Sequence, residues 1–266
     1  MADEPRVVLV AGASRGIGRA LVDRCRAHGD TVIALSRSAP DVAFEADVHH
    51  VLVDLLDAEA TAAAARGAAE ALGRLDATVY VAGVTLSGTV EESTGHEFDR
   101  VMGTNVRGAM HVARAALPVM RAAQRGLIVN VSSQSAHLPS PYFGLYGASK
   151  AALEHLTVSL DHEVRPFGIA ARLVVPGGVR TGILDGDGHG AEAVAGHEPT
   201  ESVYASALER QCRRARRAIA EGVEASVVAE AIVGVLRAED PPMRTIVGED
   251  ALHSIAEGGV WPAASD

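Results

Sequence analysis

A short turn with three glycines, between the first apolar run and the first helical pattern, constrains the fold of this chain most strongly. The apolar run Val7–Ala11 leads into the turn, and a helical pattern over Ile17–His28 follows it. Glycines at such a junction permit a tight turn, close approach of the backbone to a pyrophosphate, and close packing of helix against strand. The helix N-terminus also favours phosphate through its free N–H groups and dipole. The contacts expected from this turn are Gly12, Ser14, Arg15, Gly16, Ile17 and Gly18.

The strand-then-helix order continues along the chain. Short runs rich in Val and Ile predict strands buried on both faces of a parallel sheet. They are Val7–Ala11, Thr31–Leu35, Val51–Val53, Thr78–Val81, Leu127–Val131 and Ala170–Val175, with a last strand around Arg244–Val247. Helical patterns lie between them at Ile17–His28, Ala58–Leu72, Phe98–Ala123, Leu145–Arg165 and Ala225–Arg237. This alternation predicts an α/β fold, a Rossmann-type doubly wound parallel sheet with helices on both faces.

One stretch interrupts the alternation. Residues Gly182–Thr200 are rich in Gly, Ala and acids, and a helical pattern returns only at Ser202–Ala220. Because the stretch follows the sixth strand, it lies at the carboxyl edge of the sheet, where ligands bind. With no internal repeat or linker, residues 1–266 are expected to form a single domain, with an insertion at about 182–220 that covers the substrate.

Composition and charge exclude several classes of function. The net charge of −10 argues against nucleic-acid binding, and no apolar run reaches the length of a membrane span. Two cysteines indicate neither a disulfide framework nor a cysteine metal site. Asp185–His189 lacks the later acidic ligand of a calcium loop, and no histidine pair has zinc spacing, so no metal is expected. A cytoplasmic protein fits best, and the abundance of Arg and Ala is typical of a GC-rich bacterial genome.

The end of the second strand bears on the choice of cofactor. Ser36 and Arg37 follow Leu35 there. An acidic residue at this place binds the ribose 2′-hydroxyl of NAD, whereas a guanidinium can pair with the 2′-phosphate of NADP. Arg15 in the glycine turn can reach the same phosphate. The sequence therefore favours NADP(H).

The glycine spacing, with one more residue between the first two glycines than in Gly-x-Gly-x-x-Gly, resembles the short-chain dehydrogenase/reductase family. Five further motifs follow in the family's order, and the resemblance covers about residues 6–250. They are Asp54-Leu55 after the third strand, Asn105 in Thr104–Gly108, Ser133 after the fifth strand, Tyr146-x-x-x-Lys150, and Pro176-Gly177 with Val179 and Thr181. The resemblance implies that Asp54 bonds the adenine and that Thr181 contacts the nicotinamide carboxamide. It also implies that Asn105, Ser133, Tyr146 and Lys150 are catalytic.

Tyr146 and Lys150 lie four residues apart and so project from one helix face. The chain has one lysine and 23 arginines, and it keeps the lysine at this position. An ammonium beside a phenol favours the phenolate, so a lowered pKa of Tyr146 is expected. A compact ammonium can also bond the nicotinamide ribose. By resemblance, Lys150 passes protons through a water held by Asn105, and Ser133 holds the substrate oxygen.

The family's Asn-Asn-Ala-Gly after the fourth strand is here Tyr80, Val81, Ala82 and Gly83. Ala82 and Gly83 keep the close backbone approach to the cofactor, whereas the contacts of both asparagines must be replaced or lost.

The function implied is an NADP(H)-dependent oxidoreductase that interconverts a ketone or aldehyde and an alcohol. Two alternatives remain. The same site could serve dehydration, epimerisation or isomerisation, or the chain could be a non-catalytic NADP(H)-binding sensor. In relatives the helices matching Phe98–Ala123 and Leu145–Arg165 pair between subunits, so a homodimer or homotetramer is expected. The arginines at 210–217 fit a solvated helix face or a subunit contact, and less well a carboxylate site.

Overall fold

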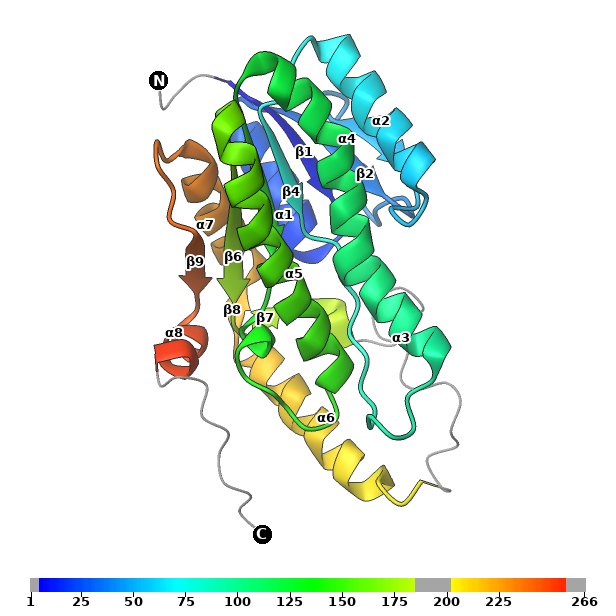
Figure 1. Cartoon of the computed structure of the whole chain (residues 1–266). Coiled ribbons are helices and arrows are strands. Elements are labelled where there is room, and N and C mark those ends of the chain that lie inside the picture. Colours follow the sequence, from blue (N-terminus) through cyan, green and yellow to red (C-terminus); the bar gives the residue numbers. More distant parts are fainter. Residues whose placement is uncertain (1–4, 185–201, 257–266) are drawn as a thin grey trace.

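The computed structural model describes residues 5–184 and 202–256, and its centre is a seven-stranded parallel sheet (Figure 1). Along the sheet the strands run in the order β3-β2-β1-β4-β5-β6-β9. They are β1 (Val7–Ala11), β2 (Thr31–Ser36), β3 (His49–Leu52), β4 (Ala77–Tyr80), β5 (Gly126–Val131), β6 (Ile169–Pro176) and β9 (Arg244–Val247). The order reverses between β1 and β4, and this is the place where ligands bind in a doubly wound sheet.

Helices cover both faces of the sheet. The main ones are α1 (Gly16–Ala27), α2 (Ala58–Leu72), α4 (Gly108–Ala123), α5 (Gly144–Val164) and α7 (Ala225–Arg237). Helices α2, α4 and α5 pack on one face, and α1 and α7 on the other (Figure 1). Because successive strand residues point to opposite faces, Leu9 joins the core under α4 while Val8 and Val10 join the core under α1 and α7. The predicted Rossmann-type fold is confirmed.

One expectation about the elements is wrong, and another misses a local feature of its helix. The third strand is β3, His49–Leu52 rather than Val51–Val53, and it is not buried on both faces: Leu52 is 61% exposed. The reason is its place at the edge of the sheet, where it pairs with β2 alone. The predicted helix Phe98–Ala123 is present as an uninterrupted helical stretch, but it contains a π-helical turn, η1 (Gly103–Arg107), between α3 (Gly95–Met102) and α4.

The chain after β6 forms two very short strands and a long surface helix. Strand β7 (Val179–Arg180) pairs with β8 (Val223–Glu224), and α6 (Ala205–Ala220) lies between them in the chain. The predicted helix at Ser202–Ala220 is thus present, and the arginines at 210–217 are exposed on it. Short helical turns at Gln134–Ala136 (η2), Arg165–Phe167 (η3) and Gly182–Leu184 (η4), and helix α8 (Glu249–Ala256), complete the described elements. Most of Gly182–Thr200, including Asp185–His189, lies outside the described residues. No helix among those described has both the length and the hydropathy to cross a bilayer.

Candidate active site

The glycine turn joins β1 to α1 at the carboxyl edge of the sheet. Gly12 has φ +93°, and a Cβ there would stand 2.5 Å from the amide nitrogen of Ala82. Only glycine therefore fits where the turns after β1 and β4 touch. Helix α1 starts at Gly16, and its N-cap, Arg15, makes no side-chain hydrogen bond to the first turn. The N–H groups at this helix end, beside a cradle that a Cβ would fill, fit a pyrophosphate.

The residues expected at the adenosine end follow β2 and β3. Ser36 is buried, its Oγ donates to the carbonyl of Ser38 (2.7 Å), and it lies 2.8 Å from Nε2 of His50. Arg37 and Arg15 are exposed. Asp54 is exposed and its Oδ1 accepts from the N–H of Leu56 (2.9 Å), while Leu55 is buried. The Ser36–His50 contact was not predicted from the sequence.

The turn expected at the nicotinamide end is held from the C-terminal part of the chain. The N–H of Gly177 donates to the carbonyl of Val247 (2.9 Å), and that of Gly178 to Oδ2 of Asp250 (2.7 Å). Asp250 also accepts from the side chain of Gln134, one residue after Ser133 (3.2 Å). Thr181 follows this turn in the chain and lies against the glycine turn. A Cβ at Gly16 would be 3.3 Å from Cγ2 of Thr181. Val179 is buried in β7 and Pro176 ends β6.

Ser133, Tyr146 and Lys150 converge where β5 ends and α5 begins. Ser133 follows the last residues of β5 and lies close enough to Tyr146 for its side chain to lower the pKa of the phenol. The buried Nζ of Lys150 donates to the carbonyl of Val131 (2.9 Å) and lies 5.9 Å from the centre of the Tyr146 ring. The side chains that the sequence singled out for catalysis are therefore neighbours in space.

The expected direction of the tyrosine shift is wrong. Burial raises the pKa of Tyr146, and the side chain of Ser133 only partly opposes this. Burial also lowers the pKa of Lys150 to about 8, against a raising effect of Glu154. The expected attraction between an ammonium and a phenolate is outweighed here, because burial removes both groups from water and so disfavours both charged forms.

Asn105 lies in the π-helical turn η1 and is fully buried. Its amide clamps the backbone of Val84: Oδ1 accepts from the N–H (2.8 Å) and Nδ2 donates to the carbonyl (2.9 Å). Nδ2 also donates to Oγ of Ser149 on α5 (2.8 Å). Gly83 separates this clamp from the lysine, because a Cβ on Gly83 would be 3.4 Å from both Oδ1 of Asn105 and Nζ of Lys150. Asn105 thus ties the chain after β4 to the helix that carries Tyr146 and Lys150.

A buried carboxylate next to this group was missed in the sequence. Glu154, one helical turn after Lys150, accepts from Oγ of Ser132 (2.8 Å) and from Nε of Arg244 on β9 (3.0 Å). Its Oε1 also lies 3.1 Å from Nε2 of His137. Glu154 is 4% exposed, and its charge raises the pKa of Lys150. The spacing of four residues from Lys150 was the available signal, because it places Glu154 on the same helix face.

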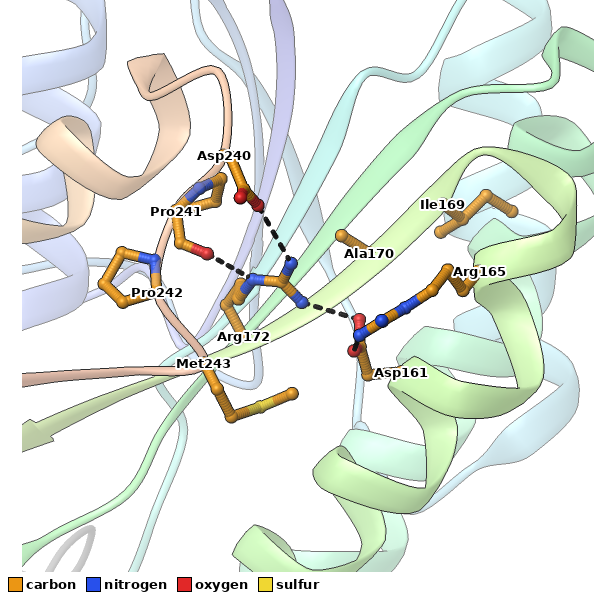
Figure 2. A pocket seen from close by; sticks show the side chains of 9 residues that line it. All are labelled: Asp161, Arg165, Ile169, Ala170, Arg172, Asp240, Pro241, Pro242 and Met243. Atoms are coloured by element: carbon orange, nitrogen blue, oxygen red, sulfur yellow. Dashed lines mark hydrogen bonds and ion pairs between the residues drawn. The ribbon is translucent and has the colours of Figure 1, made fainter.

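A pocket of about 540 Å³ lies at the opposite edge of the sheet, beside the amino ends of β6 and β9 (Figure 2). Arg172 crosses it, and its guanidinium donates to Asp161 (2.6 Å) and to the carbonyl of Pro241 (2.7 Å). Asp161 and the carbonyl of Pro241 thus provide acceptors for the Arg172 guanidinium inside the pocket. It is far from the carboxyl ends of the strands, where the predicted catalytic residues lie, so we do not assign it to the chemistry. Nor do residues 5–184 and 202–256 contain three His, Cys, Asp or Glu side chains grouped as metal ligands.

The parallel sheet with a glycine turn at its switch point defines a Rossmann-type α/β protein. The short chain dehydrogenase family model matches residues 6–190. A 3-ketodihydrosphingosine reductase from Bacteroides thetaiotaomicron is 31% identical over 97% of this chain and 93% of its own length. The crystal structure of a short-chain dehydrogenase from Streptomyces avermitilis superimposes with a TM-score of 0.81 at 32% identity, covering 96% of this chain and 92% of that one.

A short chain dehydrogenase/reductase from Burkholderia phymatum, solved in complex with NAD, superimposes with a TM-score of 0.75 at 25% identity, covering 97% of this chain and 88% of that one. The chain belongs to the short chain dehydrogenase family and is an oxidoreductase of that family.

Proposed function

We propose that the chain is an NADP(H)-dependent oxidoreductase that interconverts a ketone or aldehyde and an alcohol by hydride transfer, with Tyr146 as general acid/base. The observation that carries this proposal is the convergence of Ser133, Tyr146 and Lys150 at the carboxyl edge of the sheet, next to the glycine turn. A protein that only bound the cofactor would need the glycine turn but not a phenol, a hydroxyl and a buried ammonium together.

When NADPH is bound, it supplies the hydride. The chain's own residues then have three tasks. The hydroxyl of Ser133 donates to the substrate oxygen, where negative charge develops. Tyr146 delivers a proton to the same oxygen. Lys150, held by the carbonyl of Val131, orients the ribose hydroxyls and balances the charge left on the phenol.

We propose reduction as the working direction. In reduction Tyr146 acts as the acid in its protonated form, which burial favours by raising its pKa. Oxidation of an alcohol would need the phenolate, the form that burial disfavours. The name of the Bacteroides relative, a ketone reductase, supports the same direction.

Transfer of label from NADPH tests the proposal directly. With NADPH deuterated at both C4 positions and a panel of small ketones and aldehydes, we expect one deuterium on the carbinol carbon and one NADP⁺ for each alcohol formed. Mass spectrometry and absorbance at the NADPH band measure both quantities. Conversion of a substrate without net NADP⁺ would instead indicate dehydration, epimerisation or isomerisation. Tight NADPH binding with no turnover of any panel member would indicate a sensor.

The support for NADP(H) rather than NAD(H) comes from Arg37 and Arg15. The fold alone does not select NADP(H), since the Burkholderia phymatum protein of the same fold was solved with NAD. Arg37→Ser is expected to weaken NADPH binding about 10- to 100-fold, the usual value of a charge-assisted hydrogen bond to phosphate. NADH affinity should stay unchanged, because NADH has no 2′-phosphate. Calorimetric titration measures both, with Arg66→Ser on the exposed face of α2 as the control. Equal loss of NADPH and NADH affinity would contradict a phosphate role for Arg37.

We also propose a single domain in which the segment at about 182–220 covers the substrate. Helix α6 supports this, because Gln211 donates to Ser140, which lies between Ser133 and Tyr146 in the chain (3.0 Å).

A homodimer or homotetramer through α4 and α5 is supported by the exposed apolar side chains of Met110 and Leu156 on these helices. Two free cysteines and a net charge of −10 favour the cytoplasm.

A further inference from the structure

Tyr80 occupies the place where the family usually has the first asparagine of its Asn-Asn-Ala-Gly motif. It ends β4, and its side chain is only 1% exposed, packed in the core under α4. A buried phenol needs a partner for its hydroxyl, because an unpaired buried O–H is costly. That partner is the backbone carbonyl of Thr104, in the π-helical turn next to Asn105.

The π-helical turn explains why this carbonyl is available. In a regular α-helix the N–H of Gly108 would donate to the carbonyl of Thr104, four residues earlier. Here it donates to the carbonyl of Gly103, five residues earlier. The extra residue in the turn therefore takes the Gly108 N–H away from Thr104, and the Tyr80 hydroxyl donates to Thr104 in its place. A π-turn inside a helix is often found at a functional site.

Gly108 makes room for the phenol. A Cβ at Gly108 would overlap the Tyr80 hydroxyl and stand 3.3 Å from Cζ of the ring. The tyrosine, the glycine and the wide turn are therefore geometrically dependent on one another. Burial also raises the pKa of Tyr80, so its hydroxyl stays a donor at any pH where the protein works.

We infer that Tyr80 is a positioning residue: its hydroxyl holds the π-helical turn in the register that aims the Asn105 amide at Val84 and Ser149. Asn105 directly follows Thr104, and its amide makes three hydrogen bonds to these two residues. One of them joins it to α5, which carries Tyr146 and Lys150. The Tyr80 hydroxyl thus supports the π-helical turn from the core, at a position where the asparagine usual in the family is absent. The effect on turnover rests on the proposed function, whereas the effect on the position of Asn105 does not.

Exchange of the Val84 amide hydrogen reports the position of Asn105 without any substrate, because this N–H donates to Oδ1 of Asn105. In Tyr80→Phe, Val84 should exchange about tenfold faster or more, while Val10 in β1, which reports global unfolding, changes less. Tyr142→Phe, which removes a half-buried tyrosine hydroxyl elsewhere, should leave Val84 unchanged. Equal acceleration at Val84 and Val10, or none at Val84, would overturn the inference.

A double-variant cycle tests the coupling to Gly108. Gly108→Ala should disturb Val84 exchange more than Tyr80→Phe does, because its methyl group would overlap the hydroxyl. The double variant lacks the Tyr80 hydroxyl, so Val84 exchange should be accelerated no more than in Gly108→Ala alone. Effects that multiply would show that the two residues act independently and would contradict the inference. If Gly108→Ala does not fold, the single Tyr80→Phe comparison decides.

The turnover rate provides a second test of the inference. We expect Tyr80→Phe to lower kcat for carbonyl reduction about tenfold and leave the KM for NADPH unchanged, because the glycine turn is not altered. A wild type that reduces no carbonyl would refute the proposed function but leave the Val84 exchange comparison intact. Unchanged kcat in Tyr80→Phe with accelerated Val84 exchange would show that Asn105 moves without consequence for turnover, which would overturn the role of Tyr80 in the reaction.

Discussion

Tyr146→Phe is expected to lower kcat/KM for carbonyl reduction by about 10²- to 10⁴-fold, the usual contribution of a positioned general acid. The ring is half-buried, so phenylalanine fills the same space and removes only the proton donor. Hydride transfer would then leave an alkoxide with no acid beside it. NADPH affinity should change little, because the glycine turn and Lys150 stay in place.

Steady-state rates with NADPH and one reducible ketone measure this effect, and calorimetric titration measures cofactor binding. Tyr142→Phe is the matched control, since it removes a tyrosine hydroxyl four residues earlier in the chain. Retention of more than about a tenth of the wild-type rate in Tyr146→Phe would mean that another group, or water, donates the proton.

The pH dependence of kcat/KM in the wild type also tests this site, because the expected direction of the change is defined. Lys150 must be an ammonium to balance the charge left on the phenol, and burial lowers its pKa to about 8. In reduction, kcat/KM should therefore be constant at lower pH and fall as the pH rises above about 8, since kcat/KM reports the free enzyme. A rate that stays constant to pH 10 would show that the protonation state of Lys150 does not limit reduction.

Local patterns predicted the framework well, because they depend on neighbouring residues. The run Val7–Ala11 and the glycines after it predicted a strand and a tight turn, and both are present. The order of strands and helices then leaves few topologies, and the observed parallel sheet is one of them. Lys150 stood out for a different reason: it is the one lysine in a chain that otherwise uses arginine.

What the sequence did not predict depends on contacts between distant segments. The π-helical turn at Gly103–Arg107 leaves no trace in the helical pattern, because it shifts the register by a single residue. Tyr80 was visible only as a departure from a motif, and its partner Thr104 is 24 residues away. Asp250 reaches the turn at Gly178 across 72 residues. The pKa of Tyr146 was predicted in the wrong direction because burial cannot be read from spacing along one helix.

Asp161→Ala is expected to lower the free energy of unfolding by about 3–5 kcal/mol, the usual result of removing one partner of a buried ion pair. The Asp161 side chain is 1% exposed and accepts from Nη1 of Arg172 (2.6 Å) and Nη2 of Arg165 (2.5 Å) (Figure 2). It also accepts from the N–H of Ala171 (3.0 Å). Arg172 is itself 8% exposed. Without the carboxylate, a guanidinium would remain buried with too few acceptors, and the N–H of Ala171 would lose its partner.

Chemical denaturation measures the change, with Arg165→Ala as the control. The Arg165 side chain is 65% exposed, so its loss should cost less than about 1 kcal/mol. Burial alone would raise the pKa of Asp161, but the hydrogen bonds from Ala171, Arg165 and Arg172 lower it overall. The stabilising contribution of Asp161 is therefore present above the pKa of the unfolded state and is lost as the pH falls through the lower, folded-state pKa. The wild type should thus lose stability in acid more steeply than Asp161→Ala, and two parallel curves of stability against pH would show that the carboxylate does not carry the effect.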